Sequence, residues 1–583
     1  MEERYGLQER RQSNHAIHVE VLQVDPSGHL PLDVTSMDLV KRRLKQRHIQ
    51  ICKSPNILPS NLFDHFPKIA GTLGTGLFLG TGEAIRTAGP LGALISFALV
   101  GSVAYSSLCS LGEMTSLAPI SGSFPHFASR WVDPALGFAV GWVHLLSSPL
   151  LSIVNQSATC QNYFFTNAFY VPVEISGAQI LISLWDSHHA AIYTVVLCIL
   201  ICATNIFGVI YFGETEFAFS ILKLIMITGL IIVGLVIDLG GAPNHQRLGF
   251  QYWKNPGLFA GAKLEPGYPA LDNFLGILSV IAQAAFAYQG IEIVAVAASE
   301  TENPRRNIAK AIRRVFYRIL IFYILGVFIA GLIVPSDNPD LLAGTGFSAK
   351  SPFVIAMQIS GIRGVYLMLP AIANAGFITS AFSAGNSFLF CSSRILYGLA
   401  LRKQAPRFLT ICTKKGVPIM AVLCSSVFAF LSLMNISSGA ETVFNWFQHL
   451  CVMGGFFGWL SINITYIFFY RGLQYQGIDR RKLHYWNPLQ PWLSIWGLIW
   501  CILFILINGY SVFWDFNTSN FLTSYLNIPV FFGLFLFWKI TQGTVFWKPD
   551  EMDFTTGIPS CEETEGPTIP PKGFWQHVAA VLF

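Results

Sequence analysis

Two interruptions inside long apolar stretches contain the residues best suited to chemistry. Residues 71–76 read GTLGTG, and residues 288–292 read YQGIE, which puts a carboxylate among apolar neighbours. Where an apolar helix is broken, N–H groups at a half-helix start can bind a carboxylate, and freed C=O groups can bind an ammonium ion. Together the two interruptions predict a site for a zwitterion such as a free amino acid.

A purely structural role is the alternative for the glycine-rich interruption, because small residues let two helices pack closely. Packing does not explain Glu292, since an acidic side chain inside an apolar span is costly and usually functional. The second interruption lies five predicted spans after the first. Broken helices in corresponding positions of two halves of the chain are typical of a transporter's midplane site. We therefore favour a binding site.

The elements that must position these residues are apolar stretches of membrane-spanning length. Apolar runs of about 20 residues predict an all-α integral membrane protein with twelve transmembrane helices. The spans are expected near 69–86, 90–118, 134–184, 190–212, 216–239, 273–299, 315–335, 364–392, 417–435, 443–470, 491–514 and 521–541. The chain then divides into an N-terminal tail (1–68), a helical domain (69–541) and a C-terminal tail (542–583).

Composition excludes most other classes of protein. Of the 583 residues 53% are apolar and only 12% are charged, against about 25% in soluble domains, so a multi-domain soluble enzyme is ruled out. The net charge of +5 comes from clusters in loops, which argues against nucleic-acid binding. The 11 Cys are scattered without metal spacing. With no nucleophile, metal set or phosphate loop in sight, we expect neither an enzyme nor a cofactor.

The distribution of charge orients the predicted spans. Clusters of Lys and Arg at 305–318, 394–415 and 471–482 fall in even-numbered connections, whereas three of the odd-numbered connections, 185–189, 436–442 and 515–520, contain none. Cytosolic loops carry the excess of positive charge. Both termini are therefore predicted to be cytosolic.

Four further residues attract attention inside the predicted spans. Lys223 is a lone cation among apolar neighbours, and its structural interpretation is that the side chain snorkels to the membrane interface. Two roles are open for Glu113 with equal weight. It could accept hydrogen bonds from loop N–H groups at the cytosolic end of its helix, or it could form part of a gate. Phe444 and Trp446 suit either an aromatic lid over the site or an interfacial belt.

An ordered series of motifs resembles the fungal amino-acid permeases of the amino acid, polyamine and organocation superfamily. The resemblance runs from Arg47 to about Glu563. Its motifs are GTLGTGLF (71–78), SLGEM (110–114), SGSF (121–124), VDPALGFA (132–139), FGE (212–214), FSILK (219–223), ETENPR (300–305) with Asn307, SSR (392–394) with LY (396–397), and FWKPDEMD (546–553).

The resemblance implies two inverted five-helix repeats plus two extra helices, and proton-driven uptake of amino acids at the plasma membrane with no other cofactor. It implies that substrate carboxylate meets the first interruption and that the second forms the facing wall. The implied binding residues are Thr72, Gly74, Thr75, Gly76, Tyr288, Gln289, Gly290 and Glu292. It also favours a proton-coupling role for Lys223, because burial lets a Lys lose its proton readily.

Two segments depart from the family pattern. Ile51–Lys68 separates the N-terminal tail from the first span, and Val143–Gln161 interrupts the third. The predicted span 134–184 has 51 residues, enough for two helices at about 20 each. Two helices there would turn the sixteen Lys and Arg of the three clusters outward, against the charge rule. We therefore interpret both segments as untranslated gene sequence, that is, as introns retained in the sequence.

Two other functions remain open on these observations. A sensor would bind an amino acid without moving it, and a transporter of polyamines or choline-like cations would need no N–H groups for a carboxylate. The amino acid itself is not specified. Side chains from spans three, six, eight and ten should decide it, with Ser383 and Asn386 as candidates.

Overall fold

The computed structural model describes residues 75–120, 123–141, 162–182, 185–186, 188–207, 209–265, 267–296, 303–341, 351–362, 368–401, 405–413, 416–438 and 440–564. Thr72, Gly74, the suspected insertion 51–68 and the suspected insertion 143–161 lie outside these residues. The described part of the chain is helical, and no strand occurs in it.

The helices follow the predicted apolar runs. The first half contains α3 (Thr75–Leu117), α4 (Ser123–Trp131), α5 (Pro134–Gly141), α6 (Asn162–Ile182), α7 (Ala190–Ile206), α8 (Val209–Asp238), α9 (Gln251–Lys254), α10 (Pro269–Tyr288) and α11 (Ile293–Val296). The second contains α12 (Pro304–Arg318), η4 (Ile319–Ile324), α13 (Leu325–Ile333), η5 (Pro339–Leu341), α14 (Pro352–Ile359), α15 (Met368–Leu401), η7 (Arg407–Thr410), α16 (Ile419–Ser426), η8 (Val427–Met434), α17 (Asn435–Ser438), α18 (Ala440–Tyr475), η9 (Arg480–Lys482), α19 (Trp492–Ile507), η10 (Tyr510–Phe513), α20 (Thr518–Tyr525), α21 (Asn527–Gln542) and α22 (Cys561–Thr564).

Six helical segments of the described chain are long and apolar enough to cross a membrane. They are Gly80–Leu117, Tyr211–Asp238, Pro269–Tyr288, Pro304–Ile333, Val443–Tyr475 and Trp492–Phe513. The pair α20 and α21, bent by 42°, adds a seventh if it forms one span. The shorter apolar helices Ala190–Ile206 and Ile419–Met434 coincide with two more predicted spans. The total of twelve and the repeat arrangement stay predictions.

A sharp break divides α3 where two predicted spans meet. Gly89 has φ 75° and ψ 173°, outside the helical region, and Pro90 follows it. A Cβ atom on Gly89 would lie 2.7 Å from the carbonyl oxygen of Leu258, so a side chain there would collide with the backbone of a distant loop. The N–H of Leu91 donates to the same carbonyl at 3.1 Å. Glycine is thus required at the break.

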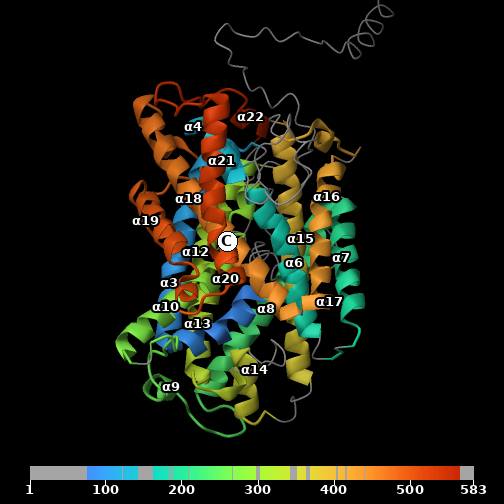
Figure 1. The fold of residues 1–583 in the computed structure, drawn as a ribbon, viewed down its shortest axis with the longest axis vertical. Coiled ribbons are helices and arrows are strands. Elements are labelled where there is room, and N and C mark those ends of the chain that lie inside the picture. The colour runs from blue at the N-terminus through green and yellow to red at the C-terminus, as the bar shows by residue number, and fades with distance from the viewer. Residues whose placement is uncertain are drawn as a thin grey trace, which may run out of the picture.

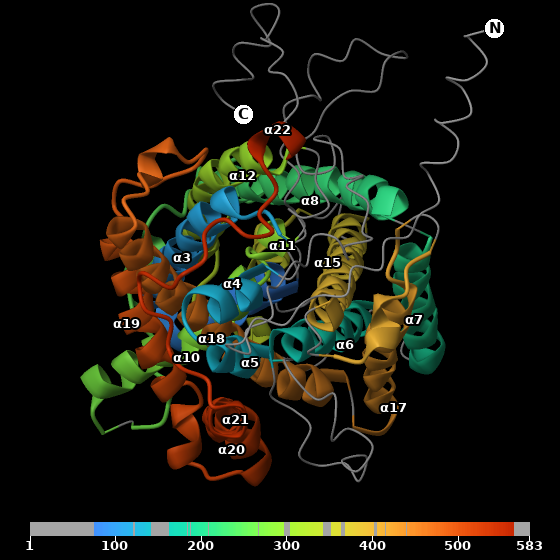
Figure 2. The same ribbon diagram turned by 90° about the horizontal axis from the view of Figure 1, so that it is seen from above.

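The helices run mainly along the long axis of the molecule, with α9 at one end and α4 and α22 at the other (Figure 1). Packing is most extensive between α3 and α10 and between α6 and its neighbours α15 and α18. Seen along the axis, α7, α19 and α21 lie at the periphery (Figure 2). Their outer faces expose apolar side chains such as Ile199, Leu506 and Phe537. Such faces suit contact with lipid.

The C-terminal segment 543–564 is tied across the helix ends at the α4 end of the molecule. The carbonyl of Asp553 accepts from the Trp131 indole at 2.9 Å, and the Arg130 guanidinium forms an ion pair with the Asp553 carboxylate at 2.9 Å. Further along, Arg305 at the start of α12 donates to the carbonyl of Pro559 at 2.6 Å and to the hydroxyl of Thr564. This segment therefore links α4 to α12.

Candidate functional site

The second predicted interruption is a break between α10 and α11. The α10 helix ends at Tyr288, Gln289 is extended (φ −60°, ψ 148°), and Gly290 has φ 88°, a left-handed conformation that favours glycine. The chain resumes a helix only at Ile293. The local sequence explains the break, because Gln-Gly at this point ends the apolar run that forms α10.

The first predicted interruption lies directly beside this break. A Cβ atom on Gly76 would lie 2.8 Å from Cδ1 of Phe286 and 2.9 Å from Cα of Ala287. Only glycine permits the start of α3 to approach the end of α10 so closely. Gly76 therefore does serve close packing, which was the structural alternative, and its packing partner is the last turn of α10. The structure places the described end of the first interruption next to the helix that leads into the second.

The side chains of the break are buried and turn toward different helices. The Gln289 amide lies against Gly455 of α18, where a Cβ atom would come within 1.8 Å of Nε2, and neither of its polar atoms has a hydrogen-bond partner. Tyr288 turns the other way and stacks on Tyr323 at 4.4 Å, with its hydroxyl beside Gly101. Glu292 is also buried. The break thus presents an amide that no group in the described part of the chain satisfies.

Aromatic rings enclose the break on the side of α6 and α15. Tyr170 of α6 stacks on Phe388 with ring centroids 4.2 Å apart and lies 5.6 Å from Phe286. Phe444 meets the Phe286 ring edge-on at 5.9 Å, next to the break, whereas Trp446 lies half-buried further along α18. The position of Phe444 suits the predicted lid, whose role stays a prediction.

Tyr170 is a residue that the sequence did not single out. Its side chain is buried, its hydroxyl has no hydrogen-bond partner, and it interacts electrostatically with Glu292. A Tyr within an apolar run reads as core, so the only signal for it is the set of helices that surround it. We define Gly76, Tyr170, Gln289, Gly290 and Glu292 as the break site.

Lys223 lies in a second buried polar group, centred on α8. Its side chain has no exposed surface, which excludes snorkelling, and it interacts electrostatically with Glu216 and Glu174. Glu216 accepts hydrogen bonds from Ser383 at 2.7 Å and from Asn386 at 3.0 Å. These five residues, from α6, α8 and α15, are called the α8 cluster below. The two α15 side chains considered for specificity thus both donate hydrogen bonds to Glu216.

The α8 cluster and the break site share two helices. On α6, Tyr170 precedes Glu174 by four residues, so the two side chains occupy one helix face about 6 Å apart along the axis. On α15, Asn386 binds Glu216, while the Phe388 ring lies where a Cβ atom on Gly290 would be 3.2 Å from it. A change at one group can therefore reach the other through a single helical turn.

Glu113 occupies a third buried polar group, at the α4 end. Its carboxylate accepts from the backbone N–H of Asn487 at 2.6 Å, from the Tyr466 hydroxyl at 2.6 Å and from Arg480 at 3.1 Å. Arg480 also donates to the carbonyl of Gln490 at 3.1 Å. We call Glu113, Tyr466, Arg480 and Asn487 the tail-end network. It ties the connection after α18 to α3. The contact with the Asn487 N–H agrees with the structural interpretation, in which Glu113 accepts hydrogen bonds from a loop.

The described part of the chain contains no group of three or more His, Cys, Asp or Glu arranged to hold a metal ion. What the described helices do contain is a polar, aromatic-lined break at the centre of an apolar bundle, beside a buried Lys with two carboxylates. Such an arrangement is typical of membrane proteins that bind a small polar ligand between their helices.

Comparison with known proteins makes the class specific. The amino acid permease family matches residues 65–549, and this chain belongs to that family. It is 37% identical to the dicarboxylic amino acid permease of Saccharomyces cerevisiae, over 90% of this chain and 82% of the relative. It is 36% identical to the basic amino-acid permease of the same yeast, over 93% and 88%. The proline-specific permease of Emericella nidulans is 37% identical over 84% and 86%. The chain is an integral membrane protein.

Proposed function

We propose that this protein moves amino acids across the plasma membrane into the cell by alternating access, driven by protons. The observation that carries the proposal is the close approach of Gly76 to the last turn of α10, which ends at the break where the Gln289 amide has no partner among the described residues. Backbone N–H and C=O groups at such interruptions recognise a carboxylate and an ammonium group together. The names of the relatives agree with an amino acid as the substrate.

Proton coupling is supported by the α8 cluster. Lys223 is buried inside the bundle and interacts electrostatically with Glu216 and Glu174. A buried Lys exchanges its proton readily because desolvation disfavours the charged form. Protonation changes the charge of the cluster one helical turn from the break site, through α6. In this proposal the proton on Lys223 sets which arrangement of α6 and α15 is stable, and therefore which side the break site faces.

The orientation follows from charge. Arg130, Arg305 and Arg480 lie at the end that also holds the C-terminal segment, and by the positive-inside rule that end faces the cytosol. Entry from the outside therefore begins at the α9 end. The relatives are named for dicarboxylic, basic and proline substrates, which leaves the side-chain preference to experiment.

The test is uptake of labelled standard amino acids by cells that lack their own permeases. Concentrative uptake that stops when an uncoupler collapses the proton gradient supports the proposal. Binding by the purified chain without accumulation in cells indicates a sensor. If amino-acid esters and polyamines compete as well as free amino acids do, carboxylate recognition is refuted and the protein transports organic cations.

A further inference from the structure

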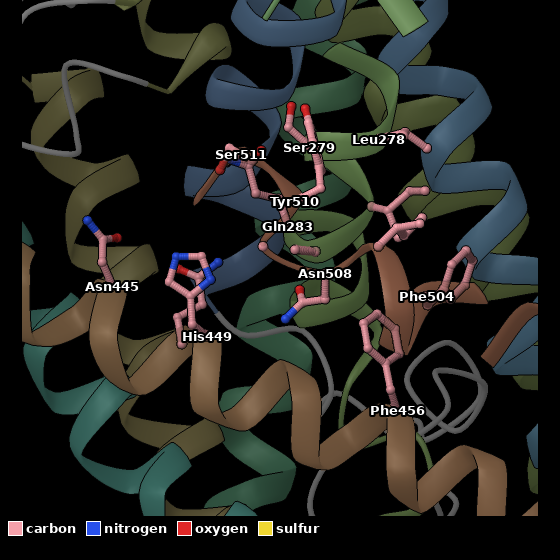
Figure 3. Close-up of a pocket in the computed structure, with 15 residues that line it drawn as sticks. Leu278, Ser279, Gln283, Asn445, His449, Phe456, Phe504, Asn508, Tyr510 and Ser511 are labelled. Carbon is pink, nitrogen blue, oxygen red and sulfur yellow. The ribbon is translucent and has the colours of Figure 1, made fainter. Parts of the chain in front are cut away.

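A polar cavity lies on the α9 side of the break. It has a volume of about 220 Å³ and is formed by α10, α18 and the turn between α19 and η10 (Figure 3). Gln283, His449 and Asn508 represent the three elements in its lining. Gln283 precedes Tyr288, the last residue of α10, by five residues, about 7.5 Å along the helix axis. The cavity is therefore distinct from the break site and close to it.

The turn that carries Asn508 is fixed in place. Gly509 has φ 74°, and a Cβ atom there would lie 2.4 Å from the Ser524 side chain, so the turn requires glycine. The next residue, Tyr510, donates its hydroxyl proton to the carbonyl of Leu275 in α10. These contacts hold the Asn508 amide in a defined position in the wall of the cavity.

Three polar atoms in the cavity lining have no hydrogen-bond partner among the residues that the structure describes. Asn508 is 5% exposed, yet neither its Nδ2 nor its Oδ1 has a hydrogen-bond partner. The Oε1 atom of Gln283 is also buried without a partner. Burial of amide groups without partners is costly, so native proteins rarely keep them unless something else binds there. Together these atoms offer one NH₂ group, with two N–H donors, and two acceptor oxygens to whatever occupies the cavity.

The lining indicates the chemistry of the occupant. None of its residues, all in the described chain, is Asp, Glu, Lys or Arg, so the cavity has no charge that would select a simple ion. The Nδ2 donor suits a carboxylate, the two amide oxygens suit an ammonium group, and Phe456, Phe504 and Ile507 supply apolar surface. The volume equals about seven times the share of one water, about 30 Å³. That space fits a small molecule.

We propose that this cavity is a second site for a zwitterionic amino acid, filled before the molecule reaches the break site. The inference rests on the proposed function, because its ligand is the transported amino acid. An occupant here contacts α10, the helix whose end forms the break site. Filling the cavity therefore raises the local supply of substrate and favours the arrangement of α10 that receives it.

The experiment measures binding stoichiometry of the purified full-length chain, with the labelled amino acid that gives the highest uptake in the screen. Two molecules should bind per wild-type chain. Asn508→Leu removes the amide at similar size, so one molecule should bind per chain at the same ligand concentration. The dissociation constant of the weaker site should rise at least about tenfold. Asn520→Leu is the matched control, since Asn520 is exposed on α20 and does not line the cavity; it should still bind two.

Other outcomes are equally definite. One bound molecule in the wild type, unchanged by Asn508→Leu, means that the cavity holds only water and overturns the inference while transport stands. No uptake and no binding in the wild type refutes the proposed function first. If Asn508→Leu fails to fold, Gln283→Met repeats the test from the opposite wall, and two bound molecules in that variant with unchanged affinity also overturn the inference.

Discussion

The break site and the tail-end network are both buried and polar, but they differ in whether their polar atoms have hydrogen-bond partners. The Glu113 carboxylate is satisfied by three donors from Tyr466, Arg480 and Asn487. At the break site, the Gln289 amide and the Tyr170 hydroxyl are buried without partners. A satisfied network stabilises one arrangement, whereas unsatisfied groups lower stability and are retained where a ligand completes them.

This difference predicts how substitutions should behave. Removing an unsatisfied polar side chain at the break site should reduce transport and leave stability unchanged or improved. At the tail-end network substitutions should reduce stability and leave transport by each folded molecule nearly intact. A variant that violates this division would show that one of the two regions has been assigned the wrong role.

The largest effect is expected from Gly76→Ala. The new methyl group would lie under 3 Å from Phe286 and Ala287, so α3 and α10 must separate at the break. Loss of the N–H and C=O geometry should reduce uptake at least about hundredfold, while overpacking costs about 1–3 kcal/mol of stability. Gly80→Ala is the control, because a Cβ atom on Gly80 meets nothing within 4 Å. Equal uptake by the two variants would contradict the close-approach argument.

Lys223→Met should abolish accumulation against a gradient. The substitution keeps the length of the side chain but removes the charge that faces Glu216 and Glu174, so no proton can be exchanged there. Exchange of internal for external amino acid should persist in vesicles, since the break site is intact. Full concentrative uptake, with normal sensitivity to an uncoupler, would remove Lys223 from the coupling mechanism.

Gln289→Leu tests the unsatisfied amide directly. Without the amide, substrate loses a hydrogen bond inside the bundle, and the KM for uptake should rise about tenfold or more. The melting temperature in detergent should stay the same or increase, because a buried amide without partners is replaced by an apolar group of similar size. A fall in melting temperature with unchanged KM would mean that Gln289 is a packing residue.

The comparison also shows which features of the site the sequence could predict. Both interruptions are local signals: glycines and a carboxylate stand out in an apolar run, and Gly89-Pro90 marks the break between two predicted spans. The expectation that they lie close together needed only one rule, which is that broken helices of a transporter face each other at the binding site. These features were predictable because each depends on a few neighbouring residues.

Tyr170 and the α8 cluster could not be predicted in this way. Tyr170 becomes notable only because Phe388 and Phe286, far away in the chain, enclose it. Glu216 reads as a residue near the interface, and its burial depends on Ser383 and Asn386 of α15. Which polar side chains meet which is decided by tertiary packing, and a single sequence contains no direct record of it.

At the tail-end network, Glu113→Gln should affect stability more than transport. The amide removes the charge opposite Arg480, which is itself mostly buried, and breaking a buried ion pair on one side destabilises by up to about 3–5 kcal/mol. We expect a lower melting temperature and uptake per folded molecule within about threefold of wild type. A variant of normal stability with strongly reduced uptake would instead assign Glu113 to the gate.

Asp553→Asn should have the smallest effect and a distinctive dependence on pH. The Asn oxygen can still accept from the N–H groups of Thr555 and Thr556, which lie 2.9 Å from the carboxylate, so only the charge facing Arg130 is lost. Burial opposes ionisation of Asp553, but those N–H groups and the Arg130 charge outweigh it and lower the pKa of the carboxyl. The loss should be about 0.2–1 kcal/mol, since the carboxylate is partly exposed.

The sign of the pH dependence follows from that lowered pKa. Above the ordinary Asp pKa of about 3.9 the ionised group stabilises the folded chain in full, and this contribution is lost as the pH falls through the lowered value. Wild type should therefore melt slightly above Asp553→Asn near neutral pH, and the gap should close in acid. Asp550→Asn, one of the exposed acids of the same segment, should show no gap at any pH. A gap that persists in acid would mean that packing of the C-terminal segment, rather than the ion pair, links α4 to α12.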